Sequence, residues 1–433
     1  MSDETLVLGL GVSGCAASEA LISRDYKISV VDDFPSEAVK NWAEKLSLEL
    51  LPSPAVDKWD NFLDGFSQIL VSPGIPDLHP VFSAASRVGA TIIDEGDLAS
   101  EWDQRPRCAV TGTNGKTTVV TLVTEMLNHS GIDAVAAGNL EKPVVAAIED
   151  GEAECFVIEA SSFRLAHSFR FDASPAAWLN FAPDHLDHHS NLEAYLQAKK
   201  RVWEGVKDSS DAIANLCDQS VKEHSPEGAT GFGIEDSYCY VRDFDLIFAG
   251  ESILDIRDLR RRMPHDLENA QASLLIASKF GADIDSCVEI LKSFEGLEHR
   301  VSLVDERNEV SFVNDSKSTT PHSTISALRG LPGAVLIAGG RNKGLDLTLL
   351  KEAKPHAVIA IGEAAEEIVK IFEHECSVEV ANTMDEAVEK AYKKSLPVGT
   401  VLLSPACASF DWYESYVERG LDFIRAVSQL EIP

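Results

Sequence analysis

The sequence predicts a three-domain α/β protein, and three observations support this. The 433 residues suggest about three domains, at roughly 150 residues per domain. Three short apolar segments, residues 5–10, 108–111 and 334–338, each lead into a glycine-rich turn. Helical patterns follow at least two of these turns, and strands that alternate with helices form parallel sheets covered by helices. We expect domains at residues 1–95, 96–297 and 298–433.

The composition excludes several classes of protein. With 45% hydrophobic and 25% charged residues, the chain is neither disordered, collagen-like nor a coiled coil as its main architecture. No apolar run approaches the roughly 18 residues of a membrane span, so we expect no membrane partner. A net charge of −32 disfavours a nucleic-acid partner. Eight scattered cysteines without a C-x-x-C pair, together with an acidic N-terminus that is unlike a secretory signal, predict a cytoplasmic location.

A phosphate loop is the most specific motif in the chain. The segment Gly-Thr-Asn-Gly-Lys-Thr-Thr at residues 112–118 lies between an apolar strand and an amphipathic helix. In this context the backbone N–H groups cradle phosphate, Lys116 supplies a positive charge and Thr117 offers a hydroxyl to Mg²⁺. The position six residues before the lysine is Val110 instead of glycine, so the motif is a shortened variant. It predicts an ATP site.

Acidic residues and histidines follow two later strands. Glu159 ends the apolar strand at residues 155–159, and residues 184–189 contain three histidines and two aspartates. Residues at the carboxyl ends of strands in an open α/β sheet lie beside the ligand crevice. Carboxylates suit Mg²⁺, whereas imidazoles taken alone would also suit zinc or iron. An exposed strand end and an ordinary polar loop are the alternatives, and helix spacing alone places Lys199 on a solvated surface.

The first glycine-rich turn has a different pattern. Gly9-x-Gly11-x-x-Gly14 follows a strand, and Asp32 and Asp33 end the next one. This is the dinucleotide-binding fingerprint, so an NAD-dependent dehydrogenase is an alternative. The presence of a phosphate loop in the same chain disfavours this alternative.

Together these motifs resemble the Mur ligase family of peptidoglycan synthesis, to which folylpolyglutamate synthase is related. The motifs that carry the resemblance, in order, are residues 112–118, Glu159-x-Ser161-Ser162-Phe163, Asp184-His185-Leu186-Asp187-His188, Glu298-His299-Arg300 and Asp315-Ser316-Lys317-Ser318-Thr319. The C-terminal motifs Leu403-Ser-Pro-Ala-Cys-Ala-Ser-Phe-Asp411 and Tyr416-x-x-Arg419-Gly420 resemble most closely those of the D-glutamate-adding members.

The resemblance implies a fold and an activity. The fold would be a Rossmann-like N-terminal domain, a central P-loop ATPase-like domain with a mostly parallel sheet, and a Rossmann-like C-terminal domain. The activity would be ATP-dependent ligation of D-glutamate to UDP-N-acetylmuramoyl-L-alanine through an acyl phosphate, by a monomer. Another Mur or folylpolyglutamate-type ligase with a different acceptor amino acid is the alternative.

The resemblance also implies the roles of individual residues. ATP would contact Gly112, Thr113, Asn114, Gly115, Lys116, Thr117, Thr118, Asn269, Arg300 and Asp315. The UDP-linked substrate would contact Val12, Ser13, Asp32, Asp33, Ser72, Gly74 and Asn139. The incoming amino acid would contact Lys317, Thr319, Lys343, Ser409 and Tyr416, where a phenylalanine is expected at position 416. Two Mg²⁺ ions would be held by Thr117, Glu159, His185 and Lys199.

The implied catalytic residues are Lys116, His185 and Lys199. Lys199 would carry a carbamate formed from CO₂, which overrides the surface position that spacing alone predicts. Its neighbour Lys200 leaves an ambiguity of one residue.

Overall fold

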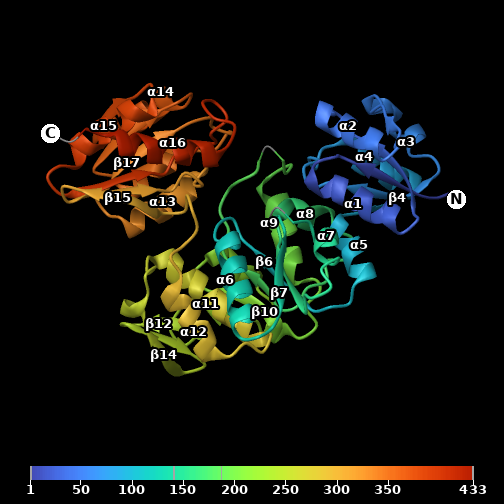
Figure 1. Cartoon of the computed structure of the whole chain (residues 1–433), viewed down its shortest axis with the longest axis horizontal. Helices are drawn as coiled ribbons and strands as arrows, with labels where there is room; N and C mark the ends of the chain where they lie inside the picture. Colours follow the sequence, from blue (N-terminus) through green and yellow to red (C-terminus); the bar gives the residue numbers. More distant parts are fainter. Residues whose placement is uncertain (1, 140–141, 187, 432–433) are drawn as a thin grey trace. The chain divides into compact units, whose positions relative to one another are not determined.

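The N-terminal part of the chain is a five-stranded, all-parallel sheet. The computed structural model describes residues 2–139, 142–186 and 188–431. The strand order is β3-β2-β1-β4-β5 (Figure 1). The strands are β1 (Ser2–Leu8), β2 (Lys27–Val31), β3 (Leu50–Leu51), β4 (Phe66–Val71) and β5 (Thr91–Ile93). The helices are α1 (Val12–Ser23), α2 (Glu37–Lys45), η1 (Val56–Lys58), α3 (Trp59–Phe62), α4 (Pro80–Val88) and α5 (Glu95–Trp102).

The central part is a nine-stranded sheet of order β14-β13-β12-β11-β10-β9-β6-β8-β7. Pairing is parallel from β7 to β12, and β12, β13 and β14 are antiparallel. The strands are β6 (Arg107–Thr111), β7 (Ala134–Gly138), β8 (Cys155–Glu159), β9 (Ala176–Trp178), β10 (Ala212–Asn215), β11 (Thr230–Phe232), β12 (Cys239–Arg242), β13 (Asp245–Phe248) and β14 (Glu251–Asp255). The helices are α6 (Lys116–His129), α7 (Val144–Ala147), α8 (Ser162–His167), α9 (Leu192–Lys200), η2 (Arg201–Trp203), η3 (Ser209–Asp211), α10 (Gln219–His224), η4 (Ile256–Asp258), α11 (Pro264–Lys279) and α12 (Ile284–Ser293).

The C-terminal part is a six-stranded sheet of order β15-β16-β20-β17-β18-β19. Only β15 runs antiparallel to its neighbour. The strands are β15 (Ser302–Arg307), β16 (Val310–Asn314), β17 (Val335–Gly339), β18 (Ala357–Ile361), β19 (Ser377–Val380) and β20 (Gly399–Leu403). The helices are α13 (Pro321–Gly330), η5 (Leu347–Ala353), α14 (Ala365–Phe372), α15 (Met384–Ser395) and α16 (Tyr416–Gln429).

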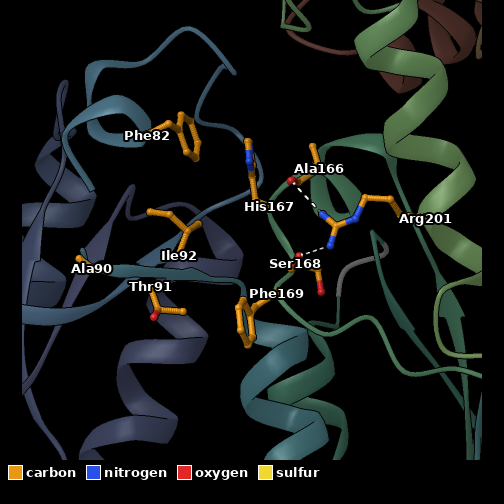
Figure 2. A pocket seen from close by; sticks show the side chains of 9 residues that line it. All are labelled: Phe82, Ala90, Thr91, Ile92, Ala166, His167, Ser168, Phe169 and Arg201. Carbon is orange, nitrogen blue, oxygen red and sulfur yellow. Dashed lines mark hydrogen bonds between the residues drawn. The ribbon is translucent and has the colours of Figure 1, made fainter. Parts of the chain in front are cut away.

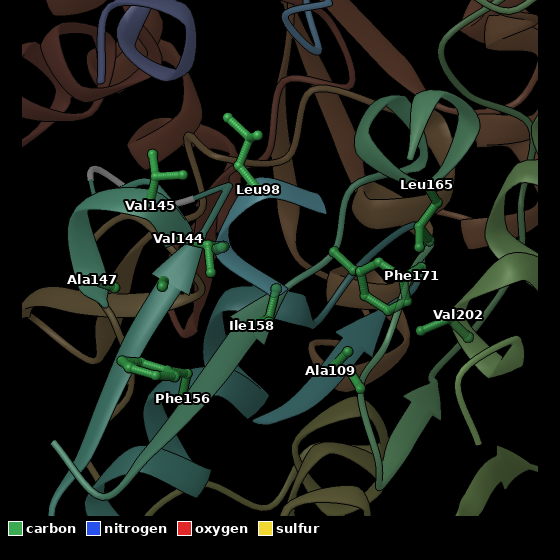
Figure 3. Close-up of a cluster of buried hydrophobic side chains, with 14 of the residues drawn as sticks. Leu98, Ala109, Val144, Val145, Ala147, Phe156, Ile158, Leu165, Phe171 and Val202 are labelled. Atoms are coloured by element: carbon green, nitrogen blue, oxygen red, sulfur yellow. The ribbon is translucent and has the colours of Figure 1, made fainter. Parts of the chain in front are cut away.

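The middle strands of the central sheet are buried on both faces, which explains their continuous apolar sequences. Every residue of β6 and β8 is buried. Figure 3 shows Phe156 and Ile158 of β8 packed with Val144 of α7 and Leu165 of α8. Each such side chain contributes about 1.5–3 kcal/mol by leaving water. This core fixes the positions at which the polar residues after the strands emerge.

Contacts divide the chain into two compact units. One comprises residues 1–181, 185–260 and 267–294, and the other comprises residues 182–184, 261–266 and 295–433. The first unit contains the N-terminal and central sheets. The three separate sheets confirm the predicted three-part α/β fold. The predicted boundaries at residues 95 and 297 stay predictions. Within the part of the chain that the structure describes, no helix is long and apolar enough to cross a membrane.

Candidate functional site

The phosphate loop lies where the sequence predicts it, between the end of β6 and the start of α6. The Lys116 ammonium folds back over the loop and donates to the carbonyl oxygens of Gly112 (2.8 Å) and Thr113 (3.0 Å). Asn180, just after β9, holds the loop from the other side. Its Oδ1 accepts from Asn114 N (2.8 Å), and its Nδ2 donates to Asn114 O (3.2 Å). The loop is therefore preorganised at a helix N-terminus, which suits an anion.

Asn269 of α11 reaches this loop across more than 150 residues of sequence. A Cβ atom added to Gly115 would lie 2.5 Å from Asn269 Oδ1, and Gly115 has a φ of +86°. Glycine is required here both for the left-handed backbone and for the close approach of the amide. The structure thus brings Asn269 to the predicted ATP loop.

Glu159 ends β8 as a buried carboxylate. Its Oε1 accepts from Asn139 Nδ2 (3.2 Å), and its carbonyl accepts from Asn139 N (3.0 Å). Its Oε2 is buried and accepts no hydrogen bond among the described residues. A buried carboxylate oxygen without a donor is costly unless a cation neutralises it. This oxygen therefore fits the predicted Mg²⁺ ligand.

Gly138, at the end of the neighbouring strand β7, allows this arrangement. It pairs with Glu159 and has a φ of +107°. A Cβ atom at this position would lie 2.5 Å from the carbonyl oxygen of Glu159. The close approach keeps Asn139 and Glu159 together at the edge of the sheet.

Lys199 is buried, which corrects the expectation from helix spacing alone. Its side chain is 1% exposed, whereas Lys200 is exposed. The Lys199 ammonium donates to Gly112 O (2.8 Å) and lies 4.8 Å from the centre of the Tyr195 ring, one helical turn earlier. Tyr195 in turn places its hydroxyl 3.1 Å from Thr113 Oγ1. Helix α9 therefore places the Lys199 ammonium against the phosphate loop, at the carbonyl oxygen of Gly112.

His185 lies in the loop that leads to α9. It has a φ of +56°, and its carbonyl oxygen accepts from the backbone N–H groups of His188 and His189. Its ring packs on Phe163 (4.6 Å between ring centres) and faces Tyr195 (5.9 Å). Asp187, part of the same predicted motif, lies outside the described residues. The aromatic contacts link His185 to both α8, which follows Glu159, and α9, which carries Lys199.

The first glycine loop is fastened to both neighbours of β1. Asp32 Oδ2 accepts from Leu10 N (2.7 Å), and Ser72 Oγ donates to Gly9 O (2.5 Å). Asp33 accepts from Ser53 and contacts His79 Nε2 (3.1 Å). The Asp32 carboxylate therefore helps to hold the conformation of the glycine loop.

Six of the seven predicted UDP-substrate residues follow β1, β2 and β4, whereas Asn139 follows β7 of the central sheet. Val12 is 69% exposed at the N-terminus of α1, next to Ser13, and a Cβ on Gly74 would meet no atom within 4 Å. An exposed helix N-terminus beside a glycine loop can receive a diphosphate.

The predicted amino-acid residues of the C-terminal unit lie in adjoining loops. The Lys317 ammonium stands 3.9 Å from the centre of the Tyr416 ring. The loop after β17, which carries Lys343, pairs with the loop after β20, since Arg341 and Ala408 exchange two backbone hydrogen bonds. Ser409 is buried beside this pairing, and Lys343 lies 5.7 Å from the ring of Phe410. Thr319 follows Lys317 in the 315–319 segment and is partly buried.

Arg419 joins two of these loops and was missed as a site residue. Its guanidinium donates to Ser316 Oγ (3.1 Å), Ser316 O (2.8 Å) and Cys407 O (3.0 Å). Burial lowers its pKa to about 10. All three acceptors are neutral. Arg419 therefore holds the segments around residues 316 and 407 together through hydrogen bonds and not through an ion pair.

Asp315 is a buried carboxyl group. Burial raises its pKa to about 6, although Ser318 Oγ (2.6 Å), Ser404 Oγ (2.7 Å) and Val301 N (3.2 Å) donate to it. The charge of Arg300 also acts on it. The two nucleotide residues predicted in this unit, Arg300 and Asp315, are therefore close to each other.

Arg164 is another residue that sequence patterns did not single out. It is fully buried and pairs with Asp94 (3.0 Å) and Glu95 at the start of α5. Glu95 also accepts from Val145 N (2.9 Å) at the start of α7. This network ties α5 and α7 to α8, the helix that follows Glu159.

A cavity of about 420 Å³ opens elsewhere in the same unit. Figure 2 shows it between Phe82 and Ile92 on one side and Ala166 to Phe169 on the other. Arg201 is the arginine that lines it, and its guanidinium donates to the carbonyl oxygens of Ala166 (3.1 Å) and Ser168 (2.6 Å). None of the predicted ATP, UDP-substrate or metal residues lines it.

The fold and the phosphate loop thus place the protein in the class of α/β proteins that bind a nucleotide through such a loop. Residues 110–258 match the Mur ligase middle domain, residues 299–407 the "Mur ligase, glutamate ligase domain", and residues 3–94 the "Mur ligase MurD-like, N-terminal domain". The chain belongs to the Mur ligase family.

Relatives of known name align over nearly the whole chain. A UDP-N-acetylmuramoylalanine–D-glutamate ligase of Thermoanaerobacter pseudethanolicus is 34% identical over 451 residues, covering 99% of this chain and 98% of the relative. A ligase of the same name from Exiguobacterium sibiricum is 35% identical over 440 residues, covering 99% and 97%.

Solved structures share the fold at low sequence identity. MurF from Acinetobacter baumannii is 15% identical with a TM-score of 0.62, covering 98% of this chain and 90% of that one. UDP-N-acetylmuramate-alanine ligase MurC from Thermotoga maritima is 16% identical with a TM-score of 0.59, covering 98% and 99%.

Proposed function

We propose that this protein joins D-glutamate to UDP-N-acetylmuramoyl-L-alanine at the expense of ATP, in the synthesis of peptidoglycan precursors for the cell wall. The proposal is supported by the agreement between the reaction for which the relatives are named and the residues of the candidate site. Relatives named for this reaction are 33–35% identical over nearly the full length. In this chain, the buried Lys199 contacts the phosphate loop, and the loop follows β6, the neighbour of the strand that ends at the buried carboxylate Glu159.

The phosphate loop would bind the β- and γ-phosphates of ATP. Lys116 already points over the loop carbonyls and can turn its ammonium to a phosphate oxygen, while the α6 N-terminus adds its partial charge. Asn180 holds the loop in shape before the nucleotide arrives, which lowers the cost of ordering it. Asn269 would contact the nucleotide from α11, and Arg300 and Asp315 from the C-terminal unit.

Two Mg²⁺ ions would be held by Thr117, Glu159, His185 and Lys199. The donor set fits, because Glu159 offers a buried oxygen without a hydrogen-bond donor, and a carbamate on Lys199 would add anionic oxygens. Bound Mg²⁺ would neutralise charge on the transferred phosphoryl group. The carbamate would form by attack of the neutral Lys199 amine on CO₂.

Ligation needs an activated carboxyl group. The L-alanyl carboxylate would attack the γ-phosphorus of ATP, forming an acyl phosphate and ADP. The amine of D-glutamate would then attack the acyl carbon, and phosphate would leave with the carbon–oxygen bond broken and one amide formed. The protein would mainly position reactants and neutralise charge, with Lys116 and His185 nearest the phosphoryl group.

The acceptor amino acid would bind in the C-terminal unit. Lys317 and Lys343 would pair with its two carboxylates, and Ser409 and Thr319 would add hydrogen bonds. Tyr416, under the Lys317 ammonium, would orient that lysine through a cation–π contact. Val12, Ser13, Asp32, Asp33, Ser72, Gly74 and Asn139 would line the site of the UDP-linked substrate. We expect a cytoplasmic monomer.

The defining experiment is phosphate release from ATP by the purified protein with Mg²⁺ and UDP-N-acetylmuramoyl-L-alanine. D-glutamate, L-glutamate and other amino acids are added one at a time. Release that depends on D-glutamate is expected. Release only with another amino acid would refute the acceptor assignment and favour a ligase of different specificity, and no release with any acceptor would refute the ligase assignment.

Lys199 and Lys200 provide a matched pair for the carbamate. After equilibration with ¹³C-bicarbonate, the wild type and Lys200→Ala are expected to show a carbamate ¹³C resonance that Lys199→Ala lacks. Phosphate release should fall by a factor of about 10² or more in Lys199→Ala, in the range of a lost electrostatic group, and stay unchanged in Lys200→Ala. A resonance that survives in Lys199→Ala would refute the assignment.

A further inference from the structure

Four residues near the predicted active site form a cluster that the proposed reaction does not use. Asp77, in the segment before α4, faces His167, His188 and His189 of the central domain. One ligand atom each of Asp77, His188 and His189 lies within 4.8 Å of the other two. We propose that these three residues form a binding site for a divalent transition metal of the zinc class, separate from the Mg²⁺ site.

The hydrogen bonds of the two histidines fix which ring nitrogen faces the carboxylate. His188 Nε2 lies 3.0 Å from the carbonyl oxygen of Pro73, which can only accept, so Nε2 carries the proton. The lone pair of the neutral ring is then on Nδ1, 3.9 Å from Asp77 Oδ1. His189 places Nε2 2.9 Å from Ser162 Oγ and Nδ1 2.9 Å from Asp77 Oδ2. Both rings therefore direct Nδ1 to the same carboxylate.

This is the arrangement that metal-binding histidines use. A histidine ligand generally donates its second N–H to an oxygen, which fixes the tautomer and the ring orientation. Pro73 O and Ser162 Oγ can serve as those acceptors. Two imidazole nitrogens and one carboxylate oxygen, with a fourth position open, form a donor set that suits Zn²⁺ and disfavours Mg²⁺.

Asp77 gives an independent indication of a cation-binding site. Its Oδ1 is buried and accepts no hydrogen bond among the described residues. A buried carboxylate oxygen without a donor is stabilised by a metal ion.

His167 is excluded as a ligand although it is close. Its Nε2 lies 3.8 Å from Asp77 Oδ1 and 3.1 Å from the carbonyl oxygen of Ile75, to which it must donate. The nitrogen that is near Asp77 therefore carries a proton and has no lone pair to offer. His167 therefore supplies a matched control, since it lies in the same cluster without belonging to the donor set.

The geometry needs only small side-chain movements to bind a metal. Metal–nitrogen and metal–oxygen bonds of about 2.0–2.1 Å put tetrahedral ligand atoms about 3.3 Å apart. The backbone is already held, because Asp77 N donates to His188 O (3.2 Å), in addition to the histidine contacts with Pro73 and Ile75. A bound metal would fasten the segment after Ser72 and Gly74 to the loop that carries His185.

The test is titration of chelator-treated full-length protein with Co²⁺, in the presence of saturating Mg²⁺ to occupy the other site. One Co²⁺ per chain with the absorption bands of low-coordinate cobalt is expected. Asp77→Asn and His189→Gln should each weaken binding by more than about tenfold, since even outer-shell changes cost 10–100-fold. His167→Gln should bind Co²⁺ as the wild type does.

X-ray absorption on Zn²⁺-loaded wild type tests the site without any variant. Two imidazole ligands are expected, whereas the predicted Mg²⁺ site contains a single histidine. The proposal is overturned if the wild type binds no Co²⁺ beside Mg²⁺, if Asp77→Asn and His189→Gln bind it unchanged, or if the absorption spectrum shows one imidazole or none.

Discussion

The buried carboxyl of Asp315 makes the stability of the C-terminal unit depend on pH. Its pKa is raised from an ordinary 3.8 to about 6 because burial disfavours the charged form. The folded state therefore binds a proton more tightly than the unfolded state does. The free energy of unfolding should fall as pH rises from about 4 to about 6, and the cost should remain at higher pH. A difference of about two pKa units corresponds to about 3 kcal/mol.

The perturbation is Asp315→Asn, which removes the titrating group and keeps its shape. The hydroxyl groups of Ser318 and Ser404 can rotate to accept from the new amide, so hydrogen bonds are retained. Near pH 4 the variant and the wild type should differ little. Above pH 6 the variant should be more stable than the wild type by up to about 3 kcal/mol, less any loss of hydrogen-bond quality.

Hydrogen exchange followed by mass spectrometry reports this unit alone. Peptides that contain β16 and β20 are compared between variant and wild type at each pH, so the intrinsic pH dependence of exchange cancels. Glu352→Gln, which removes an exposed carboxylate of the same unit, should show no such trend. A difference between Asp315→Asn and the wild type that is the same at pH 4 and pH 7 would show that the Asp315 carboxyl is not the source of the pH dependence.

Three further changes test the framework around the site. Arg164→Gln should destabilise the first unit by about 3–5 kcal/mol in chemical denaturation because two buried carboxylates lose their counter-charge, while Arg87→Gln in an exposed ion pair should have little effect. Gly138→Ala should weaken Mg²⁺ binding in calorimetry, since the added Cβ pushes on Glu159; unchanged affinity would show that this approach is unimportant. Arg419→Lys should raise the KM for D-glutamate more than it lowers kcat, because it loosens the amino-acid loops; a pure kcat loss would contradict that positioning role.

Local patterns in the sequence identify the elements that carry the site. The phosphate loop and Glu159 could be predicted because each joins a strand to a glycine turn or a strand end, and such ends meet at one edge of a parallel sheet. The burial of Lys199 could not be predicted from its residue type. The signal that was available is Tyr195, four residues earlier, which places Lys199 on the buried face of α9.

Other parts of the site depend on contacts between distant segments. Asn269 reaches Gly115 only because α11 packs against the central sheet, and nothing near it in sequence marks that approach. The burial of Arg164 could not be predicted, because a buried arginine needs acidic partners and these lie about 70 residues away in the sequence. Asp77 meets His189 across 112 residues. Pairings of this kind are set by tertiary structure and leave no local periodicity.

Activation of a carboxylate by ATP is the step on which the proposed amide formation depends. It is tested most directly with UDP-N-acetylmuramoyl-L-alanine labelled with ¹⁸O in the alanyl carboxylate, together with ATP, Mg²⁺ and D-glutamate. If an acyl phosphate forms, its bridging oxygen comes from the carboxylate, and mass spectrometry of the released phosphate should show one ¹⁸O atom for each amide formed. Released phosphate without ¹⁸O would show that water attacks ATP and would contradict the formation of an acyl phosphate.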